Sequence, residues 1–150
     1  MYKCVCFAVL LSFILCGAAL AETNCTITTK NTKVHYTVKV ADTEAAREHG
    51  LMGVTYLAPD AGMLFVFDAP RLAAFWMRGT LIPLDMLFIT ADGVIADIHA
   101  GAKPHDETPI RASVPVLSVL EIAGGMAKKQ HISVGDRVFC DSARKGLETN

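Results

Sequence analysis

The sequence predicts a mainly β fold of the α+β class: a single compact, mostly antiparallel β-barrel or sandwich-like domain with two short helices. Three observations support this prediction. Five or six strand-like segments follow one another at short spacing. Only two stretches have helical character, and both are short. Strand and helix do not alternate regularly, so a doubly wound parallel sheet is not expected.

The first predicted strand covers residues 34–40, where valine and tyrosine alternate with polar residues. Such alternation is typical of a strand with one buried face. Asp42 and Thr43 then offer an N-cap to a helix of about two turns over residues 44–49, and Gly50 supplies its C-terminal stop.

Unbroken apolar runs predict strands that are buried on both faces. These strands cover residues 63–67, 86–89 and 116–122. Residues 68–71, which include a proline, are expected to end the first of them. The turn Asp92-Gly93 is a strong hairpin signal and leads from the second into a strand at residues 94–99.

The last third of the chain begins with the longest polar loop, predicted at residues 101–111. Gly124-Gly125 is then expected to open a short helix that ends at about His131. Residues 132–140 close the domain as a strand that bends at Gly135-Asp136.

The N-terminus has the pattern of a secretory signal peptide. Lys3 precedes an apolar run over residues 4–20, which ends in the small-x-small sequence Ala19-Leu20-Ala21. We therefore expect cleavage after Ala21 and a periplasmic or secreted protein. An uncleaved anchor and a lipoprotein attached through Cys16 are the alternatives.

Removal of residues 1–21 leaves 150 − 21 = 129 residues, which suit one domain over 22–150 with its core at 34–140. The formal balance becomes 14 − 1 = 13 basic against 15 acidic residues. A mildly acidic chain without a basic tract is not expected to bind nucleic acid, or a membrane once the signal peptide is removed.

Cys25 and Cys140 are the two cysteines that remain after this cleavage. Two cysteines near opposite ends of an exported chain suggest one disulfide, and two free thiols are the alternative. No C-x-x-C motif is present, so a redox enzyme is not expected.

The stretch Phe75–Asp85, FWMRGTLIPLD, is the candidate binding region because it places polar groups between strand-like apolar runs. Trp76 could stack on a ligand, Arg78 could receive an anion, and Thr80 could donate a hydrogen bond. The same residues also have structural interpretations: a core tryptophan, an arginine that neutralises a nearby acid, and a cap for the Gly79 turn.

Asp85 and Glu121 stand out because each lies within an apolar run that is expected to be buried on both faces. A desolvated carboxylate needs a cationic or backbone N–H partner, or its pKa rises. Both side chains could therefore line a pocket, for ligand binding or acid–base work. Alternatively, each could accept backbone N–H bonds at a strand end.

No complete catalytic signature is present, and the five histidines lack metal-ligand spacing. A Cys–His nucleophile would need a free thiol, whereas both mature cysteines are expected to pair. The sequence therefore predicts neither a metal nor a cofactor, and it argues against an enzyme without excluding one.

Six groups of residues share one pattern: Ala46-Arg47 with Gly50–Met52, Gly62–Phe67, Phe75–Met77 with Thr80, Pro83–Asp85, Val119–Glu121 and Ile132–Val138. In this order they resemble the domain-of-unknown-function 192 family. The resemblance implies a small, mainly β single domain that is often exported and has no assigned biochemical role. Two positions depart from the family pattern: Gly79 stands in place of the usual asparagine, and Val54 in place of a common arginine.

Two functions of different classes follow from these residues. The first is a non-enzymatic module of the cell envelope that presents Trp76, Arg78, Thr80, Asp85 and Glu121 to a small molecule or an envelope protein. The alternative is an envelope hydrolase or transferase that uses Asp85 and Glu121 as an acid–base pair, which requires both carboxyls to face one cleft. A purely structural or interaction role is a third interpretation.

Overall fold

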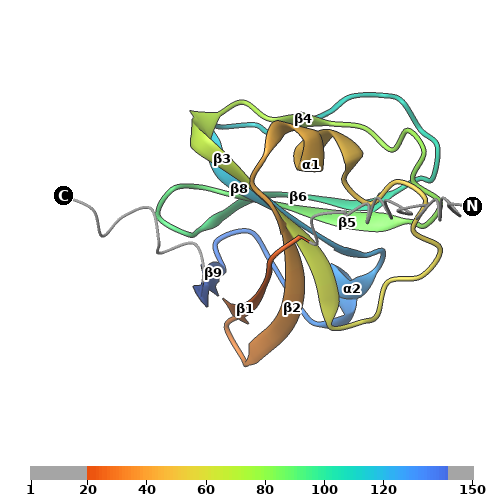
Figure 1. Cartoon of the computed structure of the whole chain (residues 1–150). Helices are drawn as coiled ribbons and strands as arrows, with labels where there is room; N and C mark the ends of the chain where they lie inside the picture. The colour runs from red at the N-terminus through yellow and green to blue at the C-terminus, as the bar shows by residue number, and fades with distance from the viewer. Residues whose placement is uncertain (1–19, 142–150) are drawn as a thin grey trace, which may run out of the picture.

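The computed structural model describes residues 20–141 and contains one curled seven-stranded sheet with the strand order β6-β5-β8-β3-β2-β1-β9 (Figure 1). Its strands are β1 (Glu22–Thr28), β2 (Lys33–Ala41), β3 (Ala61–Arg71), β5 (Leu84–Ile89), β6 (Ile95–Ala102), β8 (Val116–Ala123) and β9 (Arg137–Cys140). The remaining elements are the two-stranded sheet of β4 (Ala74–Phe75) and β7 (Ile110–Arg111), and the helices α1 (Glu44–His49) and α2 (Met126–Lys129). The predicted signal peptide lies outside the described residues, except for its last two.

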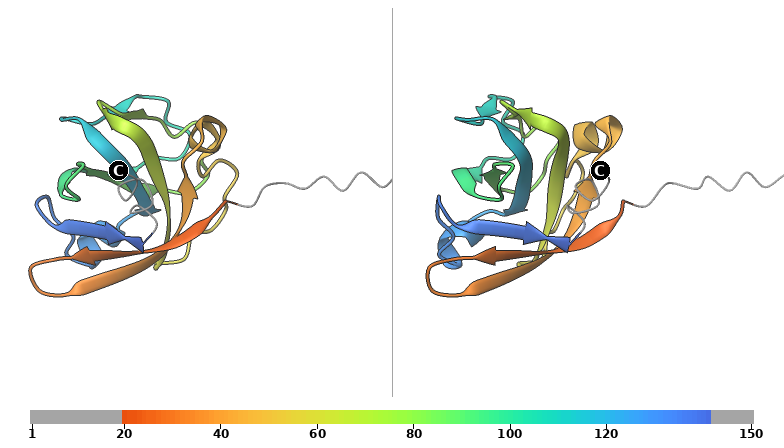
Figure 2. Two further views of the ribbon diagram at one scale, coloured as in Figure 1. Left: turned by 60° about the vertical axis from the view of Figure 1, so that its left-hand side comes forward. Right: turned by 90° about the vertical axis from the view of Figure 1, so that its left-hand side faces the viewer.

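The sheet curls until its two outer strands meet at one end (Figure 2). Val94, just before β6, bridges to Arg137 of β9. Backbone bonds of 2.9 Å from Ile95 N–H to the Asp136 carbonyl and of 2.8 Å from Val138 N–H to the Gly93 carbonyl reinforce this contact. The mainly β, barrel-like fold with two short helices is thus confirmed.

Most strand pairs are antiparallel, but β2 and β3 pair in parallel, with Val38 opposite Gly62. Parallel neighbours need a crossover connection, and here that connection carries α1. Thr43 caps α1 by accepting the Ala46 N–H, and Gly50 ends it with a positive φ of 50°. The predicted helix bounds and both caps are confirmed.

The central strands β3, β5 and β8 are buried on both faces, as their apolar runs predict. One face contributes to a core inside the curl, where Leu64, Leu87 and Leu120 pack with α2. The other face contributes to a second core, where Phe65 and Phe88 pack beneath the segments next to α1, β4 and β7. Figure 1 shows α1 and β4 on one side of these strands and α2 on the other.

Several segments differ from the sequence-based expectations. The short strands β4 and β7 were not predicted, and α2 ends at Lys129, before His131. Strand β1 was not predicted, because its residues 22–28 are mostly polar. Strand β3 continues through residues 68–71, with an irregular register between Val66 and Arg71. The last strand is shorter than expected, because residues 133–136 form a turn in which the Asp136 carboxylate accepts the Ser133 N–H at 2.7 Å.

Strands β1 and β9 are joined by a disulfide between Cys25 and Cys140, which lie opposite each other in the strand register. This confirms the predicted pairing. Just before β1, the carbonyl of Ala21 accepts a 2.8 Å bond from the Val40 N–H of β2. The chain is therefore held against β2 from the residue that precedes β1.

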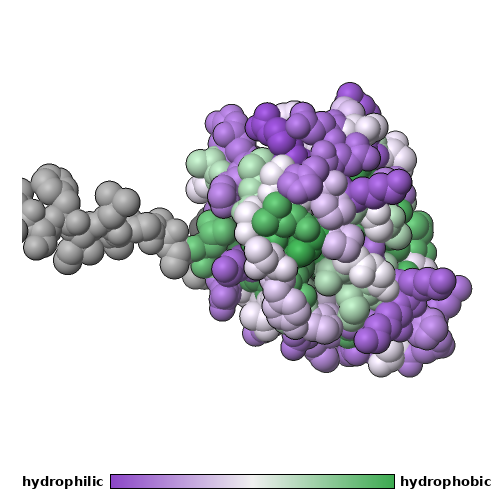
Figure 3. Space-filling model, turned by 90° about the vertical axis from the view of Figure 1, so that its right-hand side faces the viewer, coloured by the Kyte–Doolittle hydropathy of each residue, from purple (hydrophilic) through white to green (hydrophobic). Residues whose placement is uncertain are grey.

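The surface combines hydrophilic and apolar areas. Figure 3 shows a face on which a group of apolar side chains lies near the centre, among hydrophilic residues. Among the described residues, the exposed large apolar side chains are Tyr56, Leu72, Trp76, Leu81, Val114, Val134 and Phe139. From residue 20 to residue 141, no helix has the length and apolar character needed to cross a membrane.

Candidate functional site

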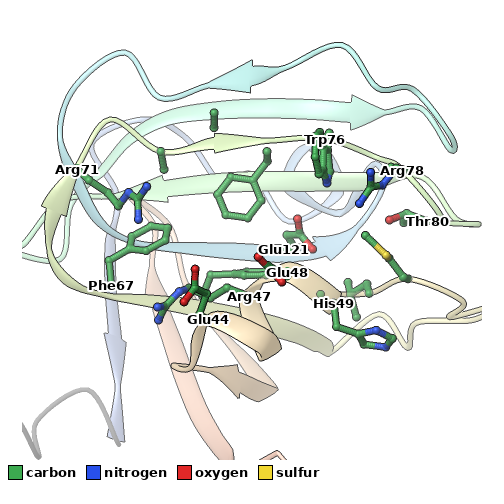
Figure 4. Close-up of a pocket in the computed structure, with 17 residues that line it drawn as sticks. Glu44, Arg47, Glu48, His49, Phe67, Arg71, Trp76, Arg78, Thr80 and Glu121 are labelled. Carbon is green, nitrogen blue, oxygen red and sulfur yellow. The ribbon is translucent and has the colours of Figure 1, made fainter.

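A cavity of about 670 Å³ lies between α1, the outer half of β3 and the segment that runs from β4 to Thr80 (Figure 4). Its volume is within the range of roughly 300–1,000 Å³ that is typical of small-molecule sites. Figure 4 shows Glu121 of β8 near the middle of the pocket, with Phe67 and Arg71 at one end and Trp76, Arg78 and Thr80 at the other. The predicted region therefore supplies one wall of the pocket.

Aromatic rings form much of the apolar lining. The Phe65 and Phe75 rings meet edge to face, with centroids 5.0 Å apart, and Phe75 meets Phe88 in the same way at 6.2 Å. These contacts anchor the lining to the second core. Trp76 also lines the pocket and is 47% exposed, so its ring is accessible to a ligand, as a stacking role requires.

Three arginines surround the pocket and contact aromatic rings. The Arg47 and Arg71 guanidinium carbons lie 5.9 and 5.3 Å from the centroid of the Phe67 ring. The Arg78 guanidinium carbon lies 4.5 Å from the centroid of the Trp76 ring. Arg47 is also held by bonds to the carbonyls of Asp42 and Val66, at 2.7 and 2.8 Å. Within residues 20–141 none of the three forms an ion pair, so their charges remain available to an anion.

The Glu121 side chain places in this pocket a carboxyl that has no hydrogen-bond or ion-pair partner among the described residues. Its side chain is 4% exposed and lines the cavity, yet no hydrogen bond or ion pair reaches it from the described part of the chain. Desolvation by burial raises the pKa of Glu121 to about 8. The carboxyl is therefore mainly protonated at pH 7 and can donate a hydrogen bond.

Thr80 lies at the end of the pocket beside Arg78 and is buried. Its hydroxyl makes no hydrogen bond to another described residue, so it is free to bond a ligand. The turn that places it depends on Gly79, which has a positive φ of 68° and accepts the Gly53 N–H at 3.0 Å. Asparagine tolerates this left-handed conformation, so the exchange at position 79 preserves the backbone.

Asp85 does not belong to this site. Its side chain is fully buried, and its carboxylate accepts three backbone N–H bonds: 2.8 Å from Gly101, 3.0 Å from Gly125 and 2.8 Å from Ala127. These bonds tie the end of β6 and the start of α2 to β5. Of the two interpretations that the sequence allows, the structural one describes Asp85, and its assignment as a ligand-binding residue is wrong.

Asp85 and Glu121 also lie on opposite faces of the sheet. In the pairing of β5 with β8, Asp85 is opposite Ile122, whereas Glu121 is opposite Met86. Paired residues point to the same face and neighbours along a strand to opposite faces, so the two carboxyls cannot share a cleft. The predicted acid–base pair is therefore wrong.

Helix α1 supplies pocket residues that the sequence reasoning missed: Glu44, Arg47, Glu48 and His49. The first three are spaced i, i+3 and i+4, which places them on one face of a helix. That spacing was a signal in the sequence, but nothing indicated which surface the helical face would border. The crossover from β2 to β3 decides this.

No group of three or more histidine, cysteine or acidic side chains among the described residues is arranged to hold a metal ion. The residues around the pocket instead offer cationic groups, hydrogen-bond donors and aromatic faces. Such a set can recognise the charge, the oxygen atoms and the apolar body of an organic molecule.

Comparisons with known proteins place the chain among uncharacterised relatives. The model of the DUF192 family, described as "Uncharacterized ACR", matches residues 25–140. A solved protein of unknown function from Novosphingobium aromaticivorans is 41% identical, with a TM-score of 0.79, over 80% of this chain and 86% of that chain. A protein from Sinorhizobium meliloti, described as a candidate transcription regulator, is 41% identical with a TM-score of 0.80, over 81% of this chain and 95% of that chain. No curated protein matches.

Proposed function

The chain belongs to the DUF192 family, a family of uncharacterised role, and we propose that this member is an exported, non-enzymatic module that binds a small organic molecule in the pocket of Glu121. The single observation that carries the proposal is the buried Glu121 carboxyl, which opens on a ligand-sized cavity and has no hydrogen-bond or ion-pair partner between residues 20 and 141. A carboxyl that faces a cavity without a protein partner can be completed by a hydrogen bond to a ligand, and a carboxyl with a raised pKa in a cleft is typical of functional sites.

The other lining residues support the same conclusion. Trp76 and Arg78 offer a flat aromatic face and a cation, and Thr80 offers a hydroxyl. Arg47 and Arg71 extend the cationic lining to the opposite end of the cavity. Pockets of this kind fix a ligand through a few polar groups and bury its apolar part.

Binding can be tested with the resonance of the indole N–H, because the chain has one tryptophan and this side chain lines the pocket. The mature domain is titrated with a library of organic acids, neutral molecules and amines of ligand size. We expect at least one class to shift the Trp76 indole resonance saturably. The proposal is wrong if no compound does so, or if every saturable response arises outside the pocket.

A pair of arginine variants assigns the response to the pocket. Arg78→Gln removes the cation over Trp76 and is expected to weaken binding several-fold. Arg111→Gln removes an exposed arginine of β7 that does not line this cavity, and it is the matched control. Equal effects of the two variants would mean that binding depends on overall charge rather than on this site.

Export is a separate part of the proposal, supported by the signal-like N-terminus and by the disulfide. Expression of the full chain in a bacterial host, followed by N-terminal sequencing of the periplasmic fraction, tests it. The expected product begins at Glu22. Full-length protein that stays in the cytoplasm with free thiols would contradict it.

A further inference from the structure

We propose that the ligand is an organic acid without an amino group, whose acidic group lies against the arginines and whose second polar group, an oxygen atom, accepts a hydrogen bond from Glu121. This inference rests on the proposed function, because it names the chemical class that the same pocket takes. Three properties of the lining lead to it: its charge, the position of Glu121, and the burial of that carboxyl, which raises its pKa.

The charged groups of the lining favour an anion. Arg71 and Arg78 are exposed and free of ion pairs among the described residues, and Arg47 is fixed by two carbonyl oxygens. Against these three cations stand the carboxylates of Glu44 and Glu48 on α1, which gives a formal sum of 3 − 2 = +1 when Glu121 is neutral. A carboxylate or phosphate is attracted to such a lining, whereas an ammonium group is repelled.

Glu121 lies between the two ends of the pocket and, in the described part of the chain, pairs with no arginine. Figure 4 shows Arg71 on one side of it and Arg78 on the other. Desolvation is the one cause that shifts the pKa of Glu121, and no guanidinium opposes it. A ligand whose acidic group reaches an arginine therefore meets Glu121 with a different part of its structure.

A neutral carboxyl is a hydrogen-bond donor, and the aromatic lining next to it suits a flat body. Phe65, Phe75 and Trp76 supply that lining. The fitting molecule therefore combines a flat or apolar body, an acidic group at one end and a carbonyl, ether or hydroxyl oxygen that reaches Glu121.

Four probes with one aromatic frame separate these requirements: 4-acetylbenzoate, 4-ethylbenzoate, 4-(aminomethyl)benzoate and 4-methylacetophenone. The first has both the acid and the acceptor, the second lacks the acceptor, the third replaces it with an ammonium group, and the fourth lacks the acid. Binding to the mature domain is followed by the ¹³C-methyl resonance of Met52, which lines the pocket and carries no exchangeable proton. A Met52→Leu variant assigns that resonance.

We expect 4-acetylbenzoate to bind most tightly, and each of the other probes at least fivefold more weakly. Its affinity should fall about tenfold between pH 7 and pH 9, because the protonated fraction of a group with a pKa of about 8 falls about tenfold over that interval. Glu121→Gln should remove this pH dependence, because the amide remains a donor at both pH values. His49→Asn, at another titratable group of the lining, should retain it.

Each contrary result overturns the inference. Tightest binding of 4-(aminomethyl)benzoate, strengthening with pH, would show an ionised Glu121 that pairs with an ammonium group. Equal binding of 4-ethylbenzoate would exclude Glu121 as a donor, and equal binding of 4-methylacetophenone would exclude the arginines as anion ligands. If no benzoate binds while a neutral molecule or amine shifts the Trp76 indole resonance, the organic-acid class is wrong and the proposed function stands.

Discussion

Glu121 and Asp85 are two buried carboxyls only 36 positions apart in the chain. They differ in the hydrogen-bond partners that the fold gives them. Asp85 has three backbone N–H partners, whereas Glu121 has none in the described part of the chain. The sequence predicts that both are buried, because each lies in an apolar run. It does not predict which one is satisfied, because the partners of Asp85 come from Gly101, Gly125 and Ala127, distant residues whose approach depends on the fold.

The burial of Glu121 makes stability depend on pH. Between the ordinary pKa of 4.5 and the folded value of about 8, the native state keeps a proton that the unfolded state releases. Wild-type stability therefore falls as pH rises through this window, by at most about 1.4 kcal/mol per pH unit. Below and above the window, Glu121 makes no contribution to the pH dependence of stability.

The Glu121→Gln variant has no carboxyl at this position, so its stability does not fall with pH for this reason. We expect its free energy of unfolding, relative to wild type, to rise steadily between about pH 5 and pH 8 and then to level off. Urea denaturation at a series of pH values measures this difference. Ser118→Ala, on the same strand, is the control for a substitution in β8 that removes no ionisable group. A difference that stays constant across the window would show that the Glu121 carboxyl is not desolvated.

Asp85→Asn tests the structural role of the other carboxyl. The asparagine amide keeps one acceptor oxygen, but its NH₂ group replaces the other and would face a backbone N–H that it cannot accept. At least one of the three backbone bonds is therefore lost. Because buried bonds to charged groups contribute about 1.5–3 kcal/mol each, we expect a loss of about 2–5 kcal/mol in urea denaturation. Asp106→Asn is the control, since its carboxylate accepts one N–H, from Thr108, in an exposed loop. A change no larger than that of the control would contradict this role.

At the scale of elements, the segment from Trp76 to Thr80 is shaped by its glycine. Gly79 has a left-handed φ of 68°, which a residue with a side chain would have to share. A Cβ atom at this position would lie 3.3 Å from the Cγ atom of Met52. Gly101 has the same φ of 68° but no heavy atom within 4 Å of the corresponding Cβ position. Substitutions at both positions would strain the backbone equally, but only those at position 79 would also meet the Met52 side chain. Comparing the two therefore distinguishes the cost of backbone strain from the cost of contact with Met52.

We expect Gly79→Ala to cost about 1–2 kcal/mol for the left-handed backbone and more for the displaced Met52 side chain. Gly101→Ala should cost the backbone part alone, and Gly79→Asn less than Gly79→Ala, because asparagine tolerates this conformation. Thermal or urea unfolding gives the order. If Gly101→Ala is the most destabilising of the three, contact with Met52 is not what constrains position 79.

The elements that the sequence predicts are those with a strong local signal. The apolar runs at 63–67, 86–89 and 116–122 lie within β3, β5 and β8, and the caps of α1 are at the expected residues. Strand β1 was missed because its buried positions include Thr23 and Cys25, which carry little apolar signal. The parallel pairing of β2 with β3 was missed because periodicity reports which face is buried and not which strand is adjacent.

That pairing also explains why the candidate site was predicted only in part. Trp76, Arg78 and Thr80 were identified from one polar stretch, and Glu121 from its apolar neighbours. The opposite wall comes from α1, whose place depends on the long-range contact between β2 and β3. A site built from segments distant in the chain is complete only in the folded molecule.

For the whole molecule, the disulfide closes a loop between residues 115 positions apart. In the chain-entropy model such a loop stabilises the native state by roughly 4–5 kcal/mol. We expect the double variant Cys25→Ala and Cys140→Ala to lose about 3–5 kcal/mol in urea denaturation while keeping the mainly β circular-dichroism spectrum. A loss below about 1 kcal/mol would mean that β1 and β9 are held by strand pairing without help from the disulfide.

The bond between the Val40 N–H and the Ala21 carbonyl bears on the order of events in the proposed maturation. The proposed cleavage after Ala21 would remove the acceptor of that bond, and in the folded chain the peptide bond to be cut adjoins a strand already paired with β2. A peptidase needs a locally unpaired segment, so we expect the proposed cut to precede the pairing of β1 or to require its local opening. Translocation of an unfolded chain, cleavage, strand pairing and oxidation of Cys25 with Cys140 would then follow one another. A chain that folded before export would shield its own processing site.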